Sequence, residues 1–146
     1  MLKVLIVEDE LMIADMVEEM LVDGGYEVCG IARTVEDAAA LGRLHQPDLA
    51  VIDVRLAGGG LGIDIPERWA DLDRIGILYA TGNPIFLMQS GAVGDACLTK
   101  PYNGADLQRS LAIVTALVAG GTATAPFPRG FQLLHGEARA NAAHGG

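Results

Sequence analysis

The chain has 146 residues, of which 51% are hydrophobic, and a formal net charge of −9 at pH 7. This length suits one domain with a substantial core, and the acidic balance argues against nucleic acid as a direct ligand, because phosphate backbones select basic surfaces. No apolar run approaches the roughly 18 residues that a membrane-spanning helix needs, so we expect no membrane contact and a cytoplasmic location.

Short apolar runs alternate with stretches of helical periodicity over most of the chain. Residues 3–7 and 49–54 are nearly continuous apolar runs, which is typical of strands buried on both faces of a parallel sheet. Thr34 has the position of a helix N-cap. The expected strands cover residues 3–7, 26–32, 49–54, 75–80 and 96–99, and the expected helices cover residues 11–21, 35–44, 66–72, 85–90 and 105–119.

This alternation predicts a doubly wound α/β fold with a five-stranded parallel sheet, (βα)5, over residues 1–119. Because the crossovers of such a sheet are right-handed, the carboxyl ends of its strands lie along one edge. Polar residues at the carboxyl ends of four of the expected strands should therefore meet there, namely Asp9, Asp53, Thr81 and Lys100. In open α/β sheets this edge is where ligands bind.

The side chains expected at this edge suit phosphoryl chemistry on Asp53. Taken alone, Asp53 has an alternative role as a turn cap before the glycine run 58–60. Glu8, Asp9 and Asp53, however, form an oxygen cluster that would repel itself without a hard divalent cation, and a few carboxylates plus water suit Mg²⁺. Lys100 adds a positive charge and Thr81 a hydroxyl donor. A carboxylate nucleophile, a metal, an ammonium and a hydroxyl are what phosphoryl transfer to an aspartate requires.

Because of these residues and their order, the chain resembles the receiver domains of two-component response regulators over about residues 2–119. The matching motifs, in family order, are Val7-Glu8-Asp9-Glu10, Asp53, Thr81-Gly82 and Lys100-Pro101. The resemblance implies the receiver, or flavodoxin-like, fold. It also implies a signalling protein, not an enzyme with an external substrate, that accepts a phosphoryl group from a histidine kinase or a phosphotransfer protein with Mg²⁺ and then contacts a downstream protein.

The resemblance also implies a metal site. Asp53 would be the phosphoacceptor and a metal ligand, and Asp9 would bind Mg²⁺ directly. Glu8 would bind Mg²⁺ through a water molecule, and the backbone carbonyl of Arg55 would be a further ligand.

Other family roles fall on residues around the phosphoryl group. Lys100 would contact the phosphoryl group and be joined to Pro101 by a cis peptide bond, which proline makes accessible. Thr81 would move toward the phosphoryl group. Arg55 and Asn83 would line the approach of the hydrolytic water, and the long cationic Arg55 side chain is expected to slow hydrolysis.

The chain departs from the family at Cys97, where receivers usually carry Phe or Tyr. Tyr79-Ala80-Thr81-Gly82 resembles the Phe-Ala-Thr-Gly motif of a subgroup of stand-alone receivers that lack this switch aromatic. Switching is therefore expected to reposition the loop over residues 81–84 and to order residues 85–90. Cys29 and Cys97 both lie in apolar segments, which favours buried, reduced thiols over a disulfide or a metal pair.

Three other kinds of protein share parts of this pattern. A haloacid-dehalogenase-type phosphatase also uses an aspartate at a strand end, but within an Asp-x-Asp motif. In this chain Arg55 stands where that motif has its second aspartate. A flavodoxin-like binding module has no use for a carboxylate pair facing a lysine. A pseudo-receiver that binds partners without phosphorylation stays open as the alternative function.

Residues 120–146 form a Gly/Ala/Pro-rich tail with too little apolar material for an output domain. Four apolar residues stand out in it, Phe127, Phe131, Leu133 and Leu134. The sequence leaves two possibilities open for them: a disordered tail, or docking on the receiver itself or on a neighbour, and it also leaves a homodimer open.

Overall fold

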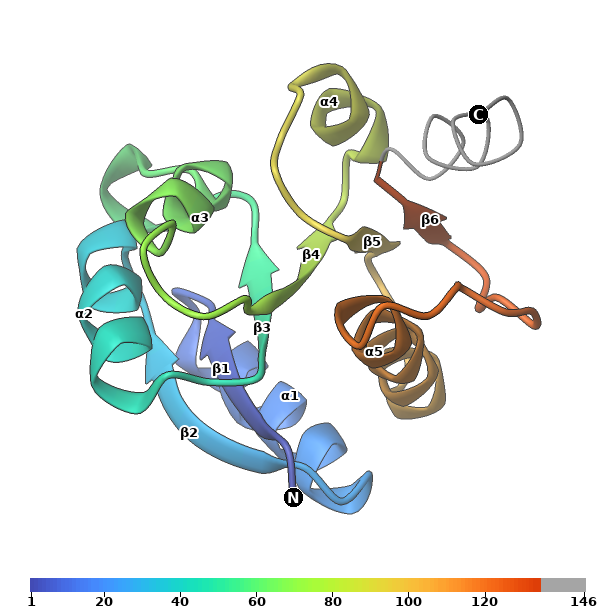
Figure 1. Cartoon of the computed structure of the whole chain (residues 1–146). Helices are drawn as coiled ribbons and strands as arrows, with labels where there is room; N and C mark the ends of the chain where they lie inside the picture. The colour runs from blue at the N-terminus through green and yellow to red at the C-terminus, as the bar shows by residue number, and fades with distance from the viewer. Residues whose placement is uncertain (135–146) are drawn as a thin grey trace.

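The structure, a computed structural model, describes residues 1–134 of the chain. Its centre is a six-stranded sheet in the order β2-β1-β3-β4-β5-β6 (Figure 1). The first five strands are parallel, and the sixth is antiparallel to β5. The strands are β1 (Lys3–Val7), β2 (Glu27–Ala32), β3 (Leu49–Asp53), β4 (Gly76–Thr81), β5 (Ala96–Thr99) and β6 (Phe131–Leu133).

Helices cover both faces of the sheet, which confirms the predicted doubly wound α/β fold. The buried side chains of α1 and α5 share one apolar cluster, and those of α2, α3 and α4 share the other. The helices are α1 (Leu11–Asp23), α2 (Val35–His45), α3 (Ile65–Arg68), α4 (Pro84–Gln89) and α5 (Gly104–Val118), with short 3-10 turns η1 (Ala57–Gly59) and η2 (Gly62–Asp64) between β3 and α3.

The central strands are largely apolar, apart from residues at their ends, because each of their faces packs on a helical layer. Along β1, Val4 and Ile6 pack in the cluster of α1 and α5, whereas Leu5 and Val7 pack in the cluster of α2, α3 and α4. All four residues are at most 1% exposed. This two-sided burial explains why β1 has no alternating pattern of polar and apolar residues.

The third helix is shorter than the sequence predicts. A helix over residues 66–72 was expected, but α3 ends at Arg68. The chain turns at Trp69, and the indole of Trp69 lies against α2 at Gly42, where any larger residue would overlap it. The tertiary contact of Trp69 with α2 therefore outweighs the weak helical pattern of this segment.

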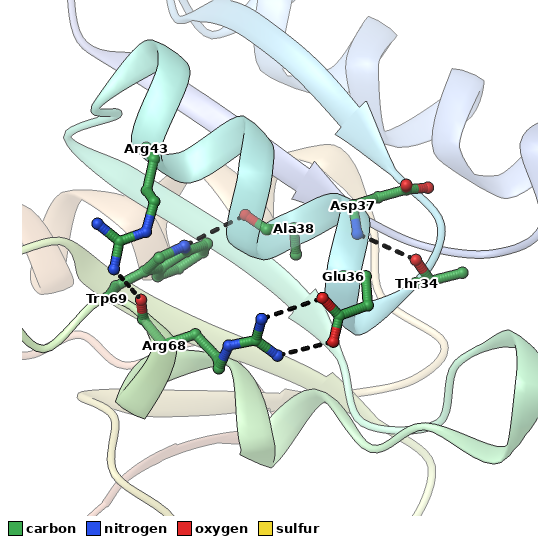
Figure 2. Close-up of polar contacts among 7 residues, drawn as sticks. All are labelled: Thr34, Glu36, Asp37, Ala38, Arg43, Arg68 and Trp69. Carbon is green, nitrogen blue, oxygen red and sulfur yellow. Dashed lines mark hydrogen bonds and ion pairs between the residues drawn. The ribbon is translucent and has the colours of Figure 1, made fainter.

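Polar contacts tie α2 to α3 on this face (Figure 2). Trp69 Nε1 donates to the Ala38 carbonyl at 3.2 Å, and the Arg68 guanidinium pairs with both carboxylate oxygens of Glu36. Arg43 Nη2 donates to the Arg68 carbonyl at 3.0 Å. The predicted cap of α2 is present, because Thr34 Oγ1 accepts from the Asp37 backbone N–H. The hydrogen bond of the indole is buried, so water does not screen it, whereas the arginine contacts are exposed.

We expect Trp69→Phe to lower the free energy of unfolding by about 1 to 3 kcal/mol, because the Ala38 carbonyl loses its indole donor and a buried volume is left unfilled. Urea unfolding measures this. It is followed by circular dichroism because Trp69 is the single tryptophan of the chain, so the variant has no tryptophan fluorescence. Glu36→Gln, which weakens only the exposed pair with Arg68, is the control and is expected to change stability much less. Equal losses in the two variants would contradict the assignment.

The segment after α5 returns to the sheet and forms β6, a strand that the sequence pattern does not predict. Arg109 donates to the carbonyls of Thr124 and Pro126 and holds the start of this segment. Phe131 and Leu134 are 8% and 3% exposed, so docking on the α/β domain of the same chain, and not a disordered tail, describes this part of the chain. Phe127 stays 47% exposed, with its ring 5.5 Å from that of Phe131. The remaining tail, residues 135–146, lies outside the described residues.

Both cysteines have free thiols, as predicted. Cys97 is fully buried and Cys29 is half-buried, and burial raises the pKa of each thiol. Among residues 1–134, we find no helix with the length and apolar character that crossing a bilayer requires.

Candidate functional site

The polar residues predicted to meet at one edge of the sheet do so. Asp53 is the last residue of β3, Thr81 is the last residue of β4, and Lys100 directly follows β5. Glu8 and Asp9 follow β1, which pairs with β3. The parallel order of these strands therefore brings together residues that are up to 92 positions apart in the chain.

A cavity of about 420 Å³ opens at this edge. Its lining comes from the ends of β1, β3, β4 and β5 and from the loops that follow them. The lining residues are Asp9, Glu10, Asp53, Val54, Arg55, Leu56, Thr81, Gly82, Asn83 and Lys100. Glu8 lies beneath this surface and is 5% exposed.

Negative charge dominates the site. The carboxylates of Glu8, Asp9 and Asp53 each offer an oxygen within 4.8 Å of the others. Lys100 Nζ is 3.3 Å from Asp53 Oδ1 and 3.5 Å from Glu8 Oε1, so one ammonium faces two of the three carboxylates. Such a set of oxygen donors with an excess of negative charge fits a hard divalent cation.

The pKa of Glu8 is raised in this environment. Burial of the carboxyl group, together with the nearby charge of Asp53, raises the pKa of Glu8 to about 7, although the Glu10 backbone N–H and Lys100 oppose the change. Glu10 N donates to Glu8 Oε2 at 3.2 Å. A cation among these oxygens would relieve the repulsion that disfavours the charged form of Glu8.

Backbone contacts connect the two sides of the cavity that β4 and β5 supply. The Thr81 carbonyl accepts from the Lys100 N–H at 2.9 Å. The Thr81 side chain is buried, and its Oγ1 accepts from the Asn83 N–H at 2.9 Å. The peptide bond between Lys100 and Pro101 is cis, as the resemblance implied. Thr81 and Lys100 are thus held together at the edge of the cavity.

Two residues near the site have contacts or surroundings that the motifs did not reveal. Asn83 lines the cavity and also begins α4, because its Oδ1 accepts from the Phe86 N–H at 3.1 Å. Tyr102 is largely buried close to the acidic cluster, and burial, with the charges of Glu8 and Asp53, raises the pKa of its hydroxyl to about 12. Its only sequence signal is that it follows Lys100-Pro101.

The loop after β3 shapes the rim that carries Arg55. Gly62 N donates to the Val54 carbonyl at 2.7 Å, and Leu56 N donates to the Gly60 carbonyl at 2.9 Å. Gly62 lies so close to the backbone of Asp53 that a Cβ at this position would overlap the Asp53 carbonyl oxygen. Gly62 is therefore part of what positions the end of β3.

Cys97 lies away from the cavity. It is fully buried in the cluster that also holds Tyr79, Leu87 and Leu134. A larger hollow of about 490 Å³ lies near the amino ends of β4 and β5, where the buried Asp95 pairs with Arg74 at 2.7 Å. That hollow is at the end of the sheet opposite to the acidic cluster.

Comparisons with known proteins agree with this geometry. The family model of the response regulator receiver domain matches residues 4–112. The transcriptional regulatory protein PdtaR of Mycobacterium tuberculosis is 35% identical over 108 residues, which is 72% of this chain and 52% of PdtaR. The chain thus spans about half the length of this relative.

Solved structures show the same fold. A variant of the anti-anti-sigma factor PhyR from Bartonella quintana aligns with a TM-score of 0.68 and 31% identity, over 82% of this chain and 49% of that one. The signal receiver domain of modulated diguanylate cyclase from Desulfovibrio desulfuricans aligns with a TM-score of 0.69 and 26% identity, over 82% of this chain and 97% of that domain. The family match covers most of the sheet and every strand that lines the cavity, and the chain belongs to the response regulator receiver domain family.

Proposed function

We propose that this protein accepts a phosphoryl group on Asp53 and signals through contacts that depend on this phosphorylation. Response regulators are signalling proteins, and this chain is a receiver domain of that type. The observation that carries the proposal is the Asp53 carboxylate at the end of β3, 3.3 Å from Lys100 Nζ and inside an acidic cluster. A nucleophilic carboxylate, a cation to neutralise phosphoryl oxygens and room for a phosphoryl group occur together there.

In the proposed reaction, an Asp53 oxygen attacks the phosphorus of a phosphohistidine donor. A P–O bond forms, the P–N bond breaks, and the imidazole of the donor leaves with the electron pair. Lys100 neutralises the charge on the transferring oxygens, and the hydroxyl of Thr81 donates a hydrogen bond to one of them. The donor would be a histidine kinase or a phosphotransfer protein.

We propose Mg²⁺ as the cofactor of this site. Asp9 and Asp53 would bind the ion directly, Glu8 would bind it through water, and the Arg55 carbonyl would complete the protein ligands. When bound, the ion supplies positive charge at the phosphoryl oxygens. The fit of three close carboxylates to a hard cation supports this assignment.

The output is proposed to be a contact with a downstream protein. PdtaR is named as a transcriptional regulatory protein and PhyR as an anti-anti-sigma factor, so both relatives are regulators of gene expression by name. We propose that this chain, too, contributes to such regulation from the cytoplasm, without contacting nucleic acid itself. The short α4 and the buried Cys97 support switching by movement of the loop over residues 81–84.

Asp9→Ala tests the metal assignment. We expect this substitution to weaken Mg²⁺ binding at least about tenfold, because a ligand carboxylate is lost, and to slow labelling by acetyl phosphate. Titration calorimetry measures the affinity, and intact-mass spectrometry measures the labelling. Asp15→Ala, which removes an exposed carboxylate from α1, is the matched control.

Unchanged Mg²⁺ affinity in Asp9→Ala would show that the acidic cluster is not a metal site. Mg²⁺-independent labelling would contradict the proposed cofactor. A wild-type chain that takes no label from acetyl phosphate or a phosphohistidine donor, with Mg²⁺ present, would favour the alternative of a pseudo-receiver.

Arg55 is proposed to set the lifetime of the aspartyl phosphate. Its side chain is exposed on the rim of the cavity, where it can lean over the phosphoryl oxygens and crowd the attacking water. We expect a lifetime of minutes or longer in the wild type and at least severalfold faster hydrolysis in Arg55→Ala. The decay of labelled protein after removal of the donor measures both, with Arg129→Ala, which removes an exposed arginine outside the cavity lining, as the control. A lifetime of seconds that Arg55→Ala leaves unchanged would contradict shielding.

A further inference from the structure

The edge of β5 is covered by a segment from the far end of the described chain. We call residues 130–134 the edge segment. Thr99 N donates to the Gly130 carbonyl at 3.0 Å, and Leu134 N donates to the Asp95 carbonyl at 3.0 Å. Between these bonds, β6 runs antiparallel to β5, with Phe131 opposite Leu98 and Gln132 opposite Cys97. The edge segment thus satisfies backbone groups that β5 would otherwise present to solvent.

Two side chains anchor the edge segment, one on each face of the sheet. Phe131 packs in the cluster of α1 and α5, and Leu134 packs in the cluster of α2, α3 and α4, beside Gly94. Gln132, between them, is exposed. The edge of β5 therefore accepts an extended segment that carries apolar side chains toward both faces and a polar side chain toward solvent.

The edge segment is short, and glycines shape the backbone at its start and in the connection that leads to it. β6 has three residues, and the connection from α5 passes through Gly120, which has a φ of 85°. Gly130 has a φ of 81°, and a Cβ there would lie 3.2 Å from the Cβ of Thr99. Close pairing with β5 therefore depends on a glycine at this position.

We propose that the β5 edge is an interaction surface that takes up an extended segment of a partner protein as an added strand, in place of the edge segment. In such strand addition, backbone hydrogen bonds supply affinity and the apolar side chains supply specificity. The partner segment is uncharged or basic, because the chain carries a net charge of −9 and residues 126–134 contain Arg129 but no acidic residue.

This surface is next to the acidic cavity. Both the backbone N and the Oγ1 of Thr99 donate to the Gly130 carbonyl. Thr99 pairs with Thr81 across the β4–β5 ladder, and Lys100 follows it in the chain. Whatever occupies the edge therefore contacts the residue that precedes Lys100. The strand exchange itself goes beyond the proposed phosphoryl acceptance and does not depend on it.

A fluorescein-labelled peptide with the sequence of residues 126–134 is the probe, and its fluorescence anisotropy is measured with the full chain. We expect Gly130→Ala to bind the peptide about tenfold more tightly than the wild type, because a left-handed backbone conformation and contact with Thr99 disfavour alanine there and loosen the competing edge segment. A peptide with serine in place of Phe131 and Leu134 is the control and is expected not to bind.

A second variant locks the edge segment. Opposed residues of an antiparallel ladder have Cα atoms about 4.5 to 5.5 Å apart, within the range of a disulfide, so Gln132→Cys can be oxidised onto the native Cys97. We expect the oxidised protein to lose peptide binding and the reduced protein to regain it, with Gln132→Ser unaffected by oxidant.

Equal affinity of the wild type and Gly130→Ala for the peptide, or no binding to Gly130→Ala, would overturn the proposal, as would full binding to the disulfide-locked protein. If the disulfide does not form, the comparison of Gly130→Ala with the wild type decides alone. The same binding is expected in an Asp53→Asn background, so a failure of phosphoryl acceptance and a failure of strand exchange are distinguishable.

Discussion

Asp53→Asn is expected to abolish labelling by acetyl phosphate and by a phosphohistidine donor. The amide has nearly the shape of the carboxylate but lacks its nucleophilic oxygen and its charge, so the ion pair with Lys100 Nζ is lost together with the reaction. Glu8 and Asp9 are also close to Asp53. Glu8 is buried beneath the cavity and Asp9 is the proposed metal ligand, so we expect neither to replace Asp53 as the acceptor. Intact-mass spectrometry after incubation with acetyl phosphate and Mg²⁺ measures the labelling.

The control for this experiment is Asp15→Asn, which changes an exposed carboxylate of α1 and should be labelled like the wild type. We also expect Asp53→Asn to fold. The charge of Asp53 repels the Glu8 carboxylate and raises the pKa of Glu8, and the substitution removes this repulsion. Stoichiometric labelling of Asp53→Asn at another acidic residue would remove Asp53 from the role of acceptor. Loss of folding, seen by circular dichroism, would make Asp53→Glu the informative variant.

Gly62→Ala is expected to have the second large effect, and for a reason of sterics. A Cβ at Gly62 would overlap the carbonyl oxygen of Asp53 and crowd the side chain of Ile52. The rim loop or the end of β3 must then move, and strain of this kind in a packed region costs about 1 to 3 kcal/mol. We expect lower stability in urea unfolding and slower labelling of Asp53.

Gly104→Ala is the matched control, because a Cβ there makes only ordinary contact with the Met20 side chain, at 3.4 Å or more. It changes a glycine to alanine at the start of α5 and should not reduce stability or labelling. If Gly62→Ala were as stable and as readily labelled as Gly104→Ala, the rim loop would not position Asp53.

The arrangement of the acidic cluster was predictable from the sequence because it depends on the order of the strands. Apolar runs identified β1, β3, β4 and β5, and right-handed crossovers require their carboxyl ends to share an edge. Asp9, Asp53, Thr81 and Lys100 meet there as expected. Their roles in phosphoryl transfer and metal binding stay predictions, which the variants described above test.

Other features depend on contacts between distant segments, which local patterns do not encode. The end of α3 at Arg68 follows from the packing of Trp69 on α2. β6 is a three-residue strand between Gly130 and Leu134, and it forms because β5 offers an unpaired edge. Sequence periodicity needs longer segments than this to indicate a strand. The docking of Phe131 and Leu134 was accordingly one of two open possibilities.

The site has similar gaps. The need for glycine at position 62 arises from one close approach to the Asp53 carbonyl, which no motif describes. Asn83 was expected only as a residue near the hydrolytic water, although its side chain also begins α4. Tyr102 lies near Glu8 and Asp53 after a bend of the chain at Lys100-Pro101, a geometry that the order of residues does not specify.

The position of Trp69 decides what tryptophan fluorescence can report. As the single tryptophan of the chain, it is 4% exposed between α2 and α3 and does not line the acidic cavity. Its emission is therefore a spectroscopic signal for the packing of that helical layer, and it should shift to longer wavelength when the protein unfolds. A change in emission on addition of Mg²⁺ or a phosphoryl donor would report that the layer rearranges at a distance from Asp53, whereas occupancy of the cavity itself calls for calorimetry or mass spectrometry.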